Sequence, residues 1–587
     1  MATQTETDAG FGTVSRFRGL VFEYASLGAS VFGIVLLAAL LVYVSIDAFD
    51  LANASPLWLL TYFLTLVVPL IGFCLYSAAD PEITRRAGLA LGGGLVASAG
   101  GFTAIEAVVG SIGRLSWPLV YLFVFVVPVT GYVIFAASQE PVGGVGFGLL
   151  GRLLGGTALG LAVGVLFLVF DPQLWMLAYT FGLLPAALAV GYEQWQPDSG
   201  MSSNALPIGI VGLLVAVGLR QVVPVYPTDL LIYIWSVAIP IAAGGAALVA
   251  TKQGRSTALA VGGVPLAIAV AGGFAAGAVG LPSKTVLLVL VTAGVPVAVF
   301  ISRTLADGEG KVGLVLPVLL AAGVVVGALL VDLAAFPAPD PWLDPSYITE
   351  APSRNAVDAG LFPAIVGSVI IIALVAILSF VLGVGTAVFL EEYTAESGIV
   401  GSITRLIQVN IANLAAVPSV VYGLLGLGLF ANVLGFGYGT AVTIGLTLSL
   451  LILPITIISA QEAIRAVPDS LRQGSFAMGA TRWQTTKNVV LPEALPGIFT
   501  GTILALGRAI GETAPLIMVG AATTVFSAPD SIWAKLSAMP MQIFAWANFP
   551  QQEFRYGVVA AGVVTLLIVL LGMNATAIIL RNKSEGV

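Results

Sequence analysis

The chain reads Leu361-Phe-Pro-Ala-Ile-Val-Gly-Ser-Val-Ile-Ile-Ile-Ala-Leu-Val-Ala-Ile-Leu-Ser-Phe-Val-Leu-Gly-Val-Gly-Thr-Ala-Val-Phe389 between two polar segments, without a charged side chain. About twenty consecutive apolar residues are enough for an α-helix to cross the hydrocarbon core of a bilayer. A strand of a membrane barrel would instead alternate apolar and polar side chains. The stretch therefore predicts a membrane-spanning helix.

Similar apolar runs fill most of the chain. Of its 587 residues, 58% are hydrophobic and 9% are charged, and the mean hydropathy is +1.04. A soluble domain carries about a quarter charged residues, so this composition cannot cover a globular surface in water. We expect an all-α, polytopic protein of the cell membrane, with about sixteen transmembrane helices in the lipid bilayer. The expected spans are 27–46, 57–77, 87–109, 117–137, 152–170, 174–192, 205–223, 229–250, 258–280, 284–303, 312–333, 361–389, 409–431, 437–459, 498–521 and 557–580.

A polar, Pro-rich segment at 337–358 interrupts the spans. The expected units are a cytoplasmic tail (1–26), a membrane region of about ten spans with no motif that indicates its role (27–305), and a six-span unit (312–587). Residues 31–51 faintly resemble residues 315–336, which is too little to indicate an internal repeat.

The distribution of Lys and Arg predicts the orientation. With the N-terminus in the cytoplasm, 16 of the 23 basic residues fall inside, six fall outside and Arg508 remains within a span. Arg152 is counted inside, at the edge of span 152–170. Because basic residues concentrate on the cytoplasmic side, both termini are expected there.

The composition also excludes several kinds of chemistry. The chain has no histidine and a single cysteine, Cys74, so we expect no histidine-based catalysis, no metal site and no cofactor. Acidic residues outnumber basic ones 30 to 23 and Lys is scarce, which is typical of proteins from high-salt environments and gives no support for nucleic-acid binding.

The longest cytoplasmic polar segment lies at 461–496, between the expected spans 437–459 and 498–521. Pro468 suits a first helical turn, and Asp469 suits the positive end of a helix dipole. Gly479 allows a helix to stop and the chain to reverse. We expect two short helices at an angle on the membrane face, where they would offer a rigid handle to another protein. An ordinary amphipathic loop is the alternative.

This segment resembles the cytoplasmic EAA loop of ABC-importer permeases, in which a Gly is followed, after a fixed spacing, by Leu-Pro. The matching residues are Gln473, Gly474, Ser475, Gly479, Ala480, Leu491 and Pro492, with Gln473 standing where the family has Glu. The resemblance implies that the segment docks into a groove of a separate ATPase subunit.

Two further stretches resemble the phosphate branch of these permeases, of the PstA type. They are Asn410-Ile-Ala-Asn-Leu-Ala-Ala-Val-Pro-Ser-Val-Val-Tyr-Gly423 and Gly507-Arg-Ala-Ile-Gly-Glu-Thr-Ala-Pro515. The resemblance covers about 312–587. It implies a subunit of an ATP-driven phosphate importer with four kinds of partner: a second homologous permease, ABC ATPase subunits, an extracellular phosphate-binding protein and inorganic phosphate.

Arg508 and Glu512 are the ionisable pair expected inside a span. Four residues apart, they would share one helix face and form an ion pair. An unpaired Arg at the bilayer centre costs about 2.5–3.5 kcal/mol, so its side chain should face protein or water. Its planar donors suit two phosphate oxygens. The resemblance implies a role in translocation for both residues and for Thr513; a pair that only fixes helix packing is the alternative.

A second polar set, Asn410, Asn413, Ser419 and Tyr422, lies near the beginning of span 409–431. A helix broken at Pro418 would free backbone groups to line a polar passage; alternatively, these side chains satisfy one another across helices. The acidic residues Glu391, Glu392 and Glu396 follow a span and are expected to be a solvated helix end.

No G-x-x-x-x-G-K-[ST] occurs in the chain, so the sequence encodes no ATP-binding loop and the chain is not expected to be an enzyme. Three alternatives stay open. The substrate could be sulfate, molybdate or phosphonate, the protein could be an ion-coupled secondary transporter that works alone, and the N-terminal region could be a sensor or scaffold.

Overall fold

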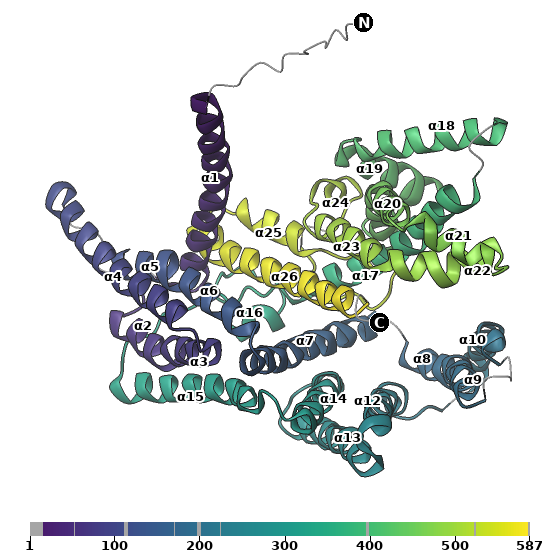
Figure 1. Ribbon diagram of the computed structural model, residues 1–587, viewed down its shortest axis with the longest axis horizontal. Coiled ribbons are helices and arrows are strands. Elements are labelled where there is room, and N and C mark those ends of the chain that lie inside the picture. The colour runs from purple at the N-terminus through teal and green to yellow at the C-terminus, as the bar shows by residue number, and fades with distance from the viewer. Residues whose placement is uncertain are drawn as a thin grey trace, which may run out of the picture.

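The computed structural model describes residues 16–51, 53–110, 116–169, 171–196, 201–223, 225–394, 398–521 and 524–584, and in these ranges the regular structure is helical (Figure 1). The α-helices are α1 (Arg16–Ala48), α2 (Pro56–Tyr62), α3 (Val68–Ala78), α4 (Pro81–Val109), α5 (Ser116–Tyr121), α6 (Val127–Ser138), α7 (Pro141–Val169), α8 (Pro172–Ala178), α9 (Leu184–Trp195), α10 (Ala205–Val222), α11 (Asp229–Tyr233), α12 (Ile239–Gln253), α13 (Arg255–Ala278), α14 (Ser283–Asp307), α15 (Leu316–Ala334), α16 (Pro345–Thr349), α17 (Phe362–Val388), α18 (Gly398–Ala415), α19 (Ser419–Gly426), α20 (Ala441–Arg465), α21 (Asp469–Ala477), α22 (Arg482–Thr485), α23 (Leu491–Ile510), α24 (Ala514–Met518), α25 (Met539–Ala547) and α26 (Val559–Ser584). Short π-helical or 3₁₀ segments join several of them: η1 (Phe63–Val67), η2 (Leu122–Val126), η3 (Tyr179–Leu183), η5 (Met201–Asn204), η6 (Ile234–Ala238), η7 (Lys311–Val315), η8 (Phe389–Tyr393), η9 (Leu427–Val433), η10 (Thr486–Val490) and η11 (Glu553–Val558).

The membrane helices agree with most of the expected spans. Fourteen helices in the described part of the chain are long and apolar enough to cross a membrane, and each overlaps an expected span, although Arg482–Ile510 begins 16 residues before the expected 498–521. The expected span 409–431 is instead a pair of helices bent by 104°. The expected span 27–46 lies within α1, several of whose side chains are outside the described residues. The all-α polytopic class is therefore confirmed, with fourteen continuous spans against the sixteen expected.

Residues 56–334 form five consecutive pairs of helices, which we call hairpins by their order in the chain, a repeat that the faint similarity between 31–51 and 315–336 does not reveal. In each hairpin the first helix carries a proline near its middle and the second helix follows after a short turn. The five prolines lie at similar intervals along the chain: Pro69, Pro128, Pro185, Pro240 and Pro296. A repeated hairpin has the composition of its neighbours, so its period is hard to see in a chain made of Ala, Gly, Leu and Val.

A π-helical turn precedes the central proline in each of the first four hairpins. The π-helical turns η1, η2, η3 and η6 each end two residues before the proline. Proline has no N–H and its ring collides with the carbonyl four residues earlier, which breaks a regular α-helix. A π-turn inserts one residue into the helical ladder and moves that carbonyl away. The prolines are therefore accommodated inside membrane helices rather than ending them.

The hairpin region begins and ends at adjacent points of the structure. The amide of Ser55 donates a hydrogen bond to the carbonyl of Pro337 over 3.3 Å, and the amide of Leu343 donates to the carbonyl of Ala48 over 3.2 Å. Helix α1 does not join the hairpins; its end packs on α26, where Ala48 is buried against Ala560. Figure 1 shows the end of α1 beside the start of α26.

Helix α15, expected to belong to the C-terminal unit, packs on the first hairpin instead. A Cβ on its Gly323 would lie 2.2 Å from the carbonyl oxygen of Thr65, and one on Gly327 would lie 2.7 Å from the ring of Tyr62. Such close contact needs glycine, so α15 is fitted to α2 and η1. Figure 1 shows it along the lower edge of the molecule, away from α1. The contacts of α15 are therefore with helices of the N-terminal membrane region.

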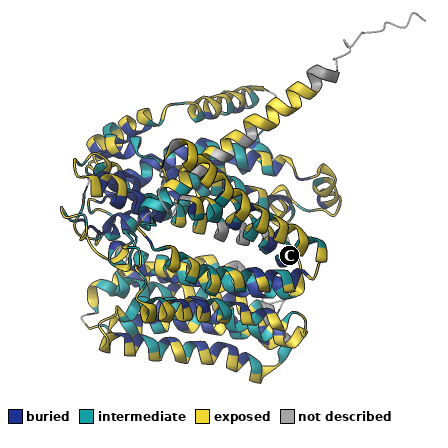
Figure 2. Cartoon of the chain, turned by 90° about the vertical axis from the view of Figure 1, so that its left-hand side faces the viewer, coloured by how far each residue is buried: buried dark blue, intermediate teal, exposed yellow. Residues whose placement is uncertain are grey.

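The most buried of the fourteen spans is α20, in the C-terminal bundle of α17, α20, α23 and α26. In the apolar window of α20, 67% of the residues are buried, against 44% for Asp229–Ala250 and 11% for Pro56–Ala78. Figure 2 shows exposed positions along most of the other helices, as lipid-facing surfaces require. The residues buried around α20 include Val375, Ile444, Leu448, Ile452 and Ala505. Helix α20 is therefore the centre against which the site-bearing helices are held.

Arg152 is an exception to the expected placement of basic residues. Its helix begins at Pro141 rather than at 152, so Arg152 lies well inside the span Pro141–Leu168. Its guanidinium stacks over the ring of Phe300 at 3.9 Å and donates to the carbonyl of Gly148 over 2.7 Å. The expectation that Arg508 alone among the basic residues lies within a span is therefore wrong.

Candidate functional site

The first polar set lies on both sides of a sharp bend. Helix α18 ends at Ala415, and α19 begins at Ser419 after Pro418. The single span expected over 409–431 is wrong because a proline disfavours helical backbone in the residue before it, and no π-turn accommodates Pro418. The bend places Asn410 and Asn413 on the exposed surface of α18, and Ser419 and Tyr422 on α19.

Arg508 and Glu512 form the expected ion pair, with Arg508 Nε 3.2 Å from Glu512 Oε1. They do not share one helix, however, because α23 ends at Ile510 and Glu512 lies in the following turn. Gly511 is the C-cap residue of α23, and Thr513 is the N-cap residue of α24. The Arg508 side chain is 47% exposed and that of Glu512 is 17% exposed. The pair thus presents its cationic member outward at a helix end.

The two polar regions meet where α19 packs on α24. A Cβ on Gly423 would lie 2.7 Å from Met518 Cβ and 2.9 Å from Pro515 Cα, so glycine allows this contact. The neighbouring Tyr422 is buried and donates its hydroxyl to the carbonyl of Leu414 over 2.8 Å. Tyr422 also belongs to the same buried cluster as Ala509 and Leu516, which lie on either side of the turn between α23 and α24.

The structure thus brings Tyr422 close to the Arg508–Glu512 pair. It places Thr513 in the same α23–α24 turn and Ser419 one helical turn before Tyr422. Asn410 donates to Leu406 of its own helix over 2.8 Å, and it remains with Asn413 on α18. The seven expected residues therefore divide into a group at the α23–α24 turn and a group on α18.

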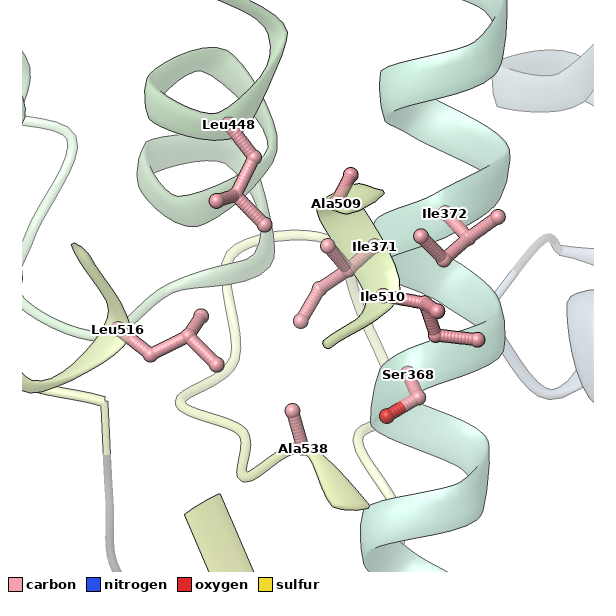
Figure 3. A pocket seen from close by; sticks show the side chains of 8 residues that line it. All are labelled: Ser368, Ile371, Ile372, Leu448, Ala509, Ile510, Leu516 and Ala538. Carbon is pink, nitrogen blue, oxygen red and sulfur yellow. The ribbon is translucent and has the colours of Figure 1, made fainter. Parts of the chain in front are cut away.

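A small cavity lies behind the α23 end (Figure 3). Its volume is about 10 Å³, which is room for about one water molecule. The lining side chains are Ser368, Ile371, Ile372, Leu448, Ala509, Ile510, Leu516 and Ala538. The hydroxyl of Ser368, the lining's polar side chain, accepts a hydrogen bond from the amide of Met539 over 2.8 Å. The cavity is a packing gap between α17, α20 and α23, too small for an anion such as phosphate.

The polar segment 461–496 folds as a short helix followed by a long one. Helix α21 ends at Ala477, and Gly479 turns the chain with a φ of 85°. The second helix is not short, because Arg482–Ile510 is one continuous span. Its π-turn η10 ends two residues before Pro492, in the same register as the π-turns of the hairpins. The expected separation of this segment from span 498–521 is therefore wrong, because a π-turn carries the helix through Pro492 as in the hairpins.

The expected docking residues surround the turn between these helices. Ser475 is buried, with its hydroxyl 2.9 Å from that of Thr485, and Ala480 donates its amide to the Ser475 carbonyl over 3.2 Å. Leu491 is half-buried. The remaining ones, Gln473, Gly474, Gly479 and Pro492, are exposed, and so are the large apolar side chains Leu471, Phe476, Met478 and Trp483. The segment therefore offers a rigid apolar surface beside a glycine turn.

Comparison with known proteins identifies the family. Residues 383–584 match the model of the binding-protein-dependent transport system inner membrane component. The phosphate transport system permease protein PstA 1 of Mycobacterium tuberculosis is 34% identical over 38% of this chain and 70% of its own length. The chain belongs to this permease family.

Other relatives of the permease carry related names. The phosphate transport system permease protein PstA of Yersinia pestis is 31% identical over 40% of this chain and 76% of its own length. The probable ABC transporter permease protein YqgI of Bacillus subtilis is 37% identical over 30% of this chain and 59% of its own length. The inward-facing MetNI methionine ABC transporter shares 19% identity over 38% of this chain and 97% of its own, and its TM-score of 0.32 is too low to add to the assignment.

The permease also contains two partly buried acidic residues where the sequence predicts a solvated helix end. Glu391 and Glu392 at the end of α17 are 14% and 12% exposed, so the expected solvated helix end is wrong at these positions; Glu396 lies outside the described residues. Both carboxylates bind arginines of the polar segment 461–496, which we call the docking segment. Two adjacent acidic residues that directly follow an uncharged span are the sequence feature that could have indicated these contacts. No group of three His, Cys, Asp or Glu side chains in the described ranges could hold a metal ion.

Proposed function

We propose that this permease is a transmembrane subunit of an ATP-driven importer for inorganic phosphate and that it forms part of the translocation pathway. The observation that carries the proposal is Arg508, a half-exposed guanidinium at the end of α23, in a chain whose relatives are named phosphate transport permeases. A guanidinium presents parallel donors that match two phosphate oxygens, and it keeps its charge at any physiological pH.

The residues around Arg508 have separate roles in this proposal. Glu512 orients the guanidinium through the 3.2 Å contact and lowers the cost of holding it in the membrane while no anion is bound. Thr513 and Tyr422 supply hydroxyls near the charge. Asn410, Asn413 and Ser419 would complete a polar passage beyond the α18–α19 bend, once a second homologous permease covers the exposed face.

The segment 461–496 would be the contact with the ATPase subunits. Its exposed apolar side chains, together with the turn at Gly479, form the surface that would enter the ATPase. Because one continuous helix joins Arg482 to Ile510, a displacement at the docking surface reaches Arg508 about 40 Å away. ATP would be hydrolysed by those separate subunits, so this permease would itself be a transporter subunit rather than an enzyme. An extracellular phosphate-binding protein would deliver the substrate.

The orientation follows from the basic residues and the number of crossings. If α1 and the bent pair α18–α19 each cross once in addition to the fourteen continuous spans, both termini lie on the same side. The excess of Lys and Arg places that side in the cytoplasm. The Arg465–Glu391 and Arg472–Glu392 pairs and the ATPase-contacting surface would then also be cytoplasmic, where ATP is available.

We further propose a division of the permease that differs from the expected one. Helix α1 would be the first helix of the transport unit, since it packs on α26, and residues 56–334 would be an inserted domain of five hairpins. The hydrogen bond between Ser55 and Pro337 supports this division because inserted domains have neighbouring ends. The inserted domain would be a scaffold or sensor rather than part of the pathway.

Reconstitution tests the proposed function. The permease is placed in liposomes with its second permease and its ATPase, with binding protein outside, and uptake of radiolabelled phosphate is measured with and without ATP. We expect ATP-dependent phosphate uptake that excess sulfate, molybdate or phosphonate leaves unchanged. Uptake of one of those anions in place of phosphate would assign the substrate differently, and phosphate uptake by the permease alone along an ion gradient would assign a secondary transporter.

A further inference from the structure

The cytoplasmic end of α17 carries two partly buried acidic residues that each bind a different part of the docking segment. Glu391 and Glu392 lie in η8, directly after the uncharged helix α17. Their side chains are 14% and 12% exposed. Removing a carboxylate from water carries a large free-energy penalty unless a cationic partner offsets it. Their partners come from the end of α20 and from α21, about 70 to 80 residues further along the sequence. Ion pairs therefore attach this end of α17 to the docking segment.

Glu391 binds the end of α20. Arg465 Nε and Nη2 donate to its two carboxylate oxygens over 2.8 and 2.7 Å, and Gln461 Nε2 adds a third contact of 2.6 Å. Two parallel hydrogen bonds between a guanidinium and a carboxylate fix orientation as well as distance. Glu391 thus fixes α17 to the helix from which the docking segment departs.

Glu392 binds the docking segment itself. Arg472, on α21, donates through Nε and Nη2 to its Oε1 over 3.3 and 3.1 Å. The same guanidinium donates to the carbonyls of Ile464 and Val467 over 2.8 and 2.6 Å. Arg482 approaches the backbone carbonyl of Glu392 at 3.4 Å. Arg472 therefore holds three elements together: the end of α17, the end of α20 and α21.

The far part of α17 lies against the region of Arg508. Ser368, Ile371 and Ile372 of α17 face Ala509 and Ile510 across the small cavity (Figure 3). Arg508 is the neighbour of Ala509 on α23. A displacement of α21 thus has two routes to the Arg508 region: the continuous helix Arg482–Ile510, and α17 through Glu392. The first route is covalent, and the second depends on an ion pair.

We propose that the Glu392–Arg472 pair is the second attachment of the ATPase-contacting segment, and that it makes α17 move together with α21 when the ATPase closes. Glu392 and Arg472 are positioning residues: they contact neither substrate nor nucleotide, and they act by keeping α17 in register with α23. With only the covalent attachment, α23 would move past α17 and the face around Arg508 would not open and close as a unit. The proposal rests on the proposed coupling to an ATPase but does not depend on which anion is transported.

Spin labels test this directly in the assembled complex. Cys74→Ala removes the native cysteine; Phe389→Cys at the end of α17 and Ser470→Cys on α21 then supply exposed labelling sites. We expect a narrow distance distribution that ATP does not change. Glu392→Gln and Arg472→Gln should broaden it, the double variant should broaden it no further than Arg472→Gln does, and Arg472→Lys should keep much of the narrow distribution. Glu309→Gln, an exposed acid in the turn after α14 and outside the docking segment, is the control.

The same variants are tested for coupling. Glu392→Gln should keep ATP hydrolysis and ATPase binding while the amount of anion moved per ATP falls by about fivefold or more, since couplings of this kind are of that size. A distance distribution in Glu392→Gln as narrow as in the native complex would overturn the inference. The native complex could instead show the narrow distance distribution between the spin labels and yet transport an anion other than phosphate. That result would refute the proposed substrate and leave this inference standing.

Discussion

The amide of Ser55 donates a hydrogen bond to the carbonyl of Pro337 over 3.3 Å, although the five hairpins lie between these residues in the sequence. The chain therefore leaves the C-terminal bundle after α1 and returns to it at the same place. Two segments that meet in this way can be joined directly without a long linker.

Excision of residues 56–336 should therefore leave a permease that still assembles with its partners. Helix α1 would keep its contact with α26, and the short loop at Ser55 would continue into Pro337. Co-purification of the ATPase and uptake in liposomes measure the result. Deletion of residues 1–305 is the informative comparison because it removes α1 and leaves α15 without the first hairpin; we expect loss of assembly. The opposite ranking of the two deletions would contradict the proposed division.

Arg508→Gln should lower phosphate uptake by about 10- to 100-fold, because hydrogen bonds to a charged group contribute about 1.5–3 kcal/mol and the amide carries no charge. Arg508→Lys should retain part of the uptake since it keeps the charge without the planar donors. Uptake and co-purification are measured together, and assembly should persist in both variants. Arg405→Gln, on the exposed side of α18, is a matched control. Normal uptake by Arg508→Gln would remove this residue from the mechanism.

Gly479→Ala should disturb the turn of the docking segment. A Cβ at this position meets open space, but its φ of 85° costs an L-residue about 1–2 kcal/mol. We expect slower uptake for each ATP hydrolysed and weaker ATPase binding, measured by titration of the ATPase. Gly308→Ala is the matched control, since Gly308 has the same φ of 85° in equally open space but lies outside the docking segment. Equal behaviour of the two variants would show that the turn at Gly479 has no special role in coupling.

Gly156→Val should destabilise the hairpin region. A Cβ at this position would lie 2.4 Å from Ala293 Cα of α14, and the carbonyl of Gly156 accepts a hydrogen bond from Thr292 over 2.7 Å. Overpacking of this kind lowers the free energy of unfolding by about 1–3 kcal/mol. Thermal unfolding in lipid nanodiscs measures the effect. Gly155→Val, where a Cβ meets nothing within 4 Å, should unfold like the native protein; a similar loss in both would point to helix propensity instead.

The positions of most spans follow from the sequence because apolar length alone decides whether a helix crosses the bilayer. The two spans predicted wrongly, 409–431 and 498–521, each depend on the effect of a proline. Pro492 and the charged residues Arg482 and Lys487 indicate a loop before span 498–521, whereas a π-turn carries the helix through Pro492. Whether a proline ends a helix depends on the turn that precedes it, as Pro418 and Pro492 show, and composition does not record that turn.

Part of the site can also be predicted from the sequence. Arg508 and Glu512 are four residues apart, so their contact is a local property that a helical pattern and the following turn both allow. The contacts of Glu391 and Glu392 involve arginines about 70–90 residues further along the chain, and only the packing of α17 on α20 brings them together. The sequence shows that these acids end an apolar helix but not which residues face them.

The five hairpins have a consequence for how this membrane region can vary. Each hairpin crosses the bilayer twice, so gaining or losing one changes the number of crossings by an even number. The segment after Pro337 then emerges on the same side of the membrane whatever the number of hairpins. Duplication within residues 56–334 can therefore enlarge this region in evolution without inverting the topology of the bundle that carries Arg508.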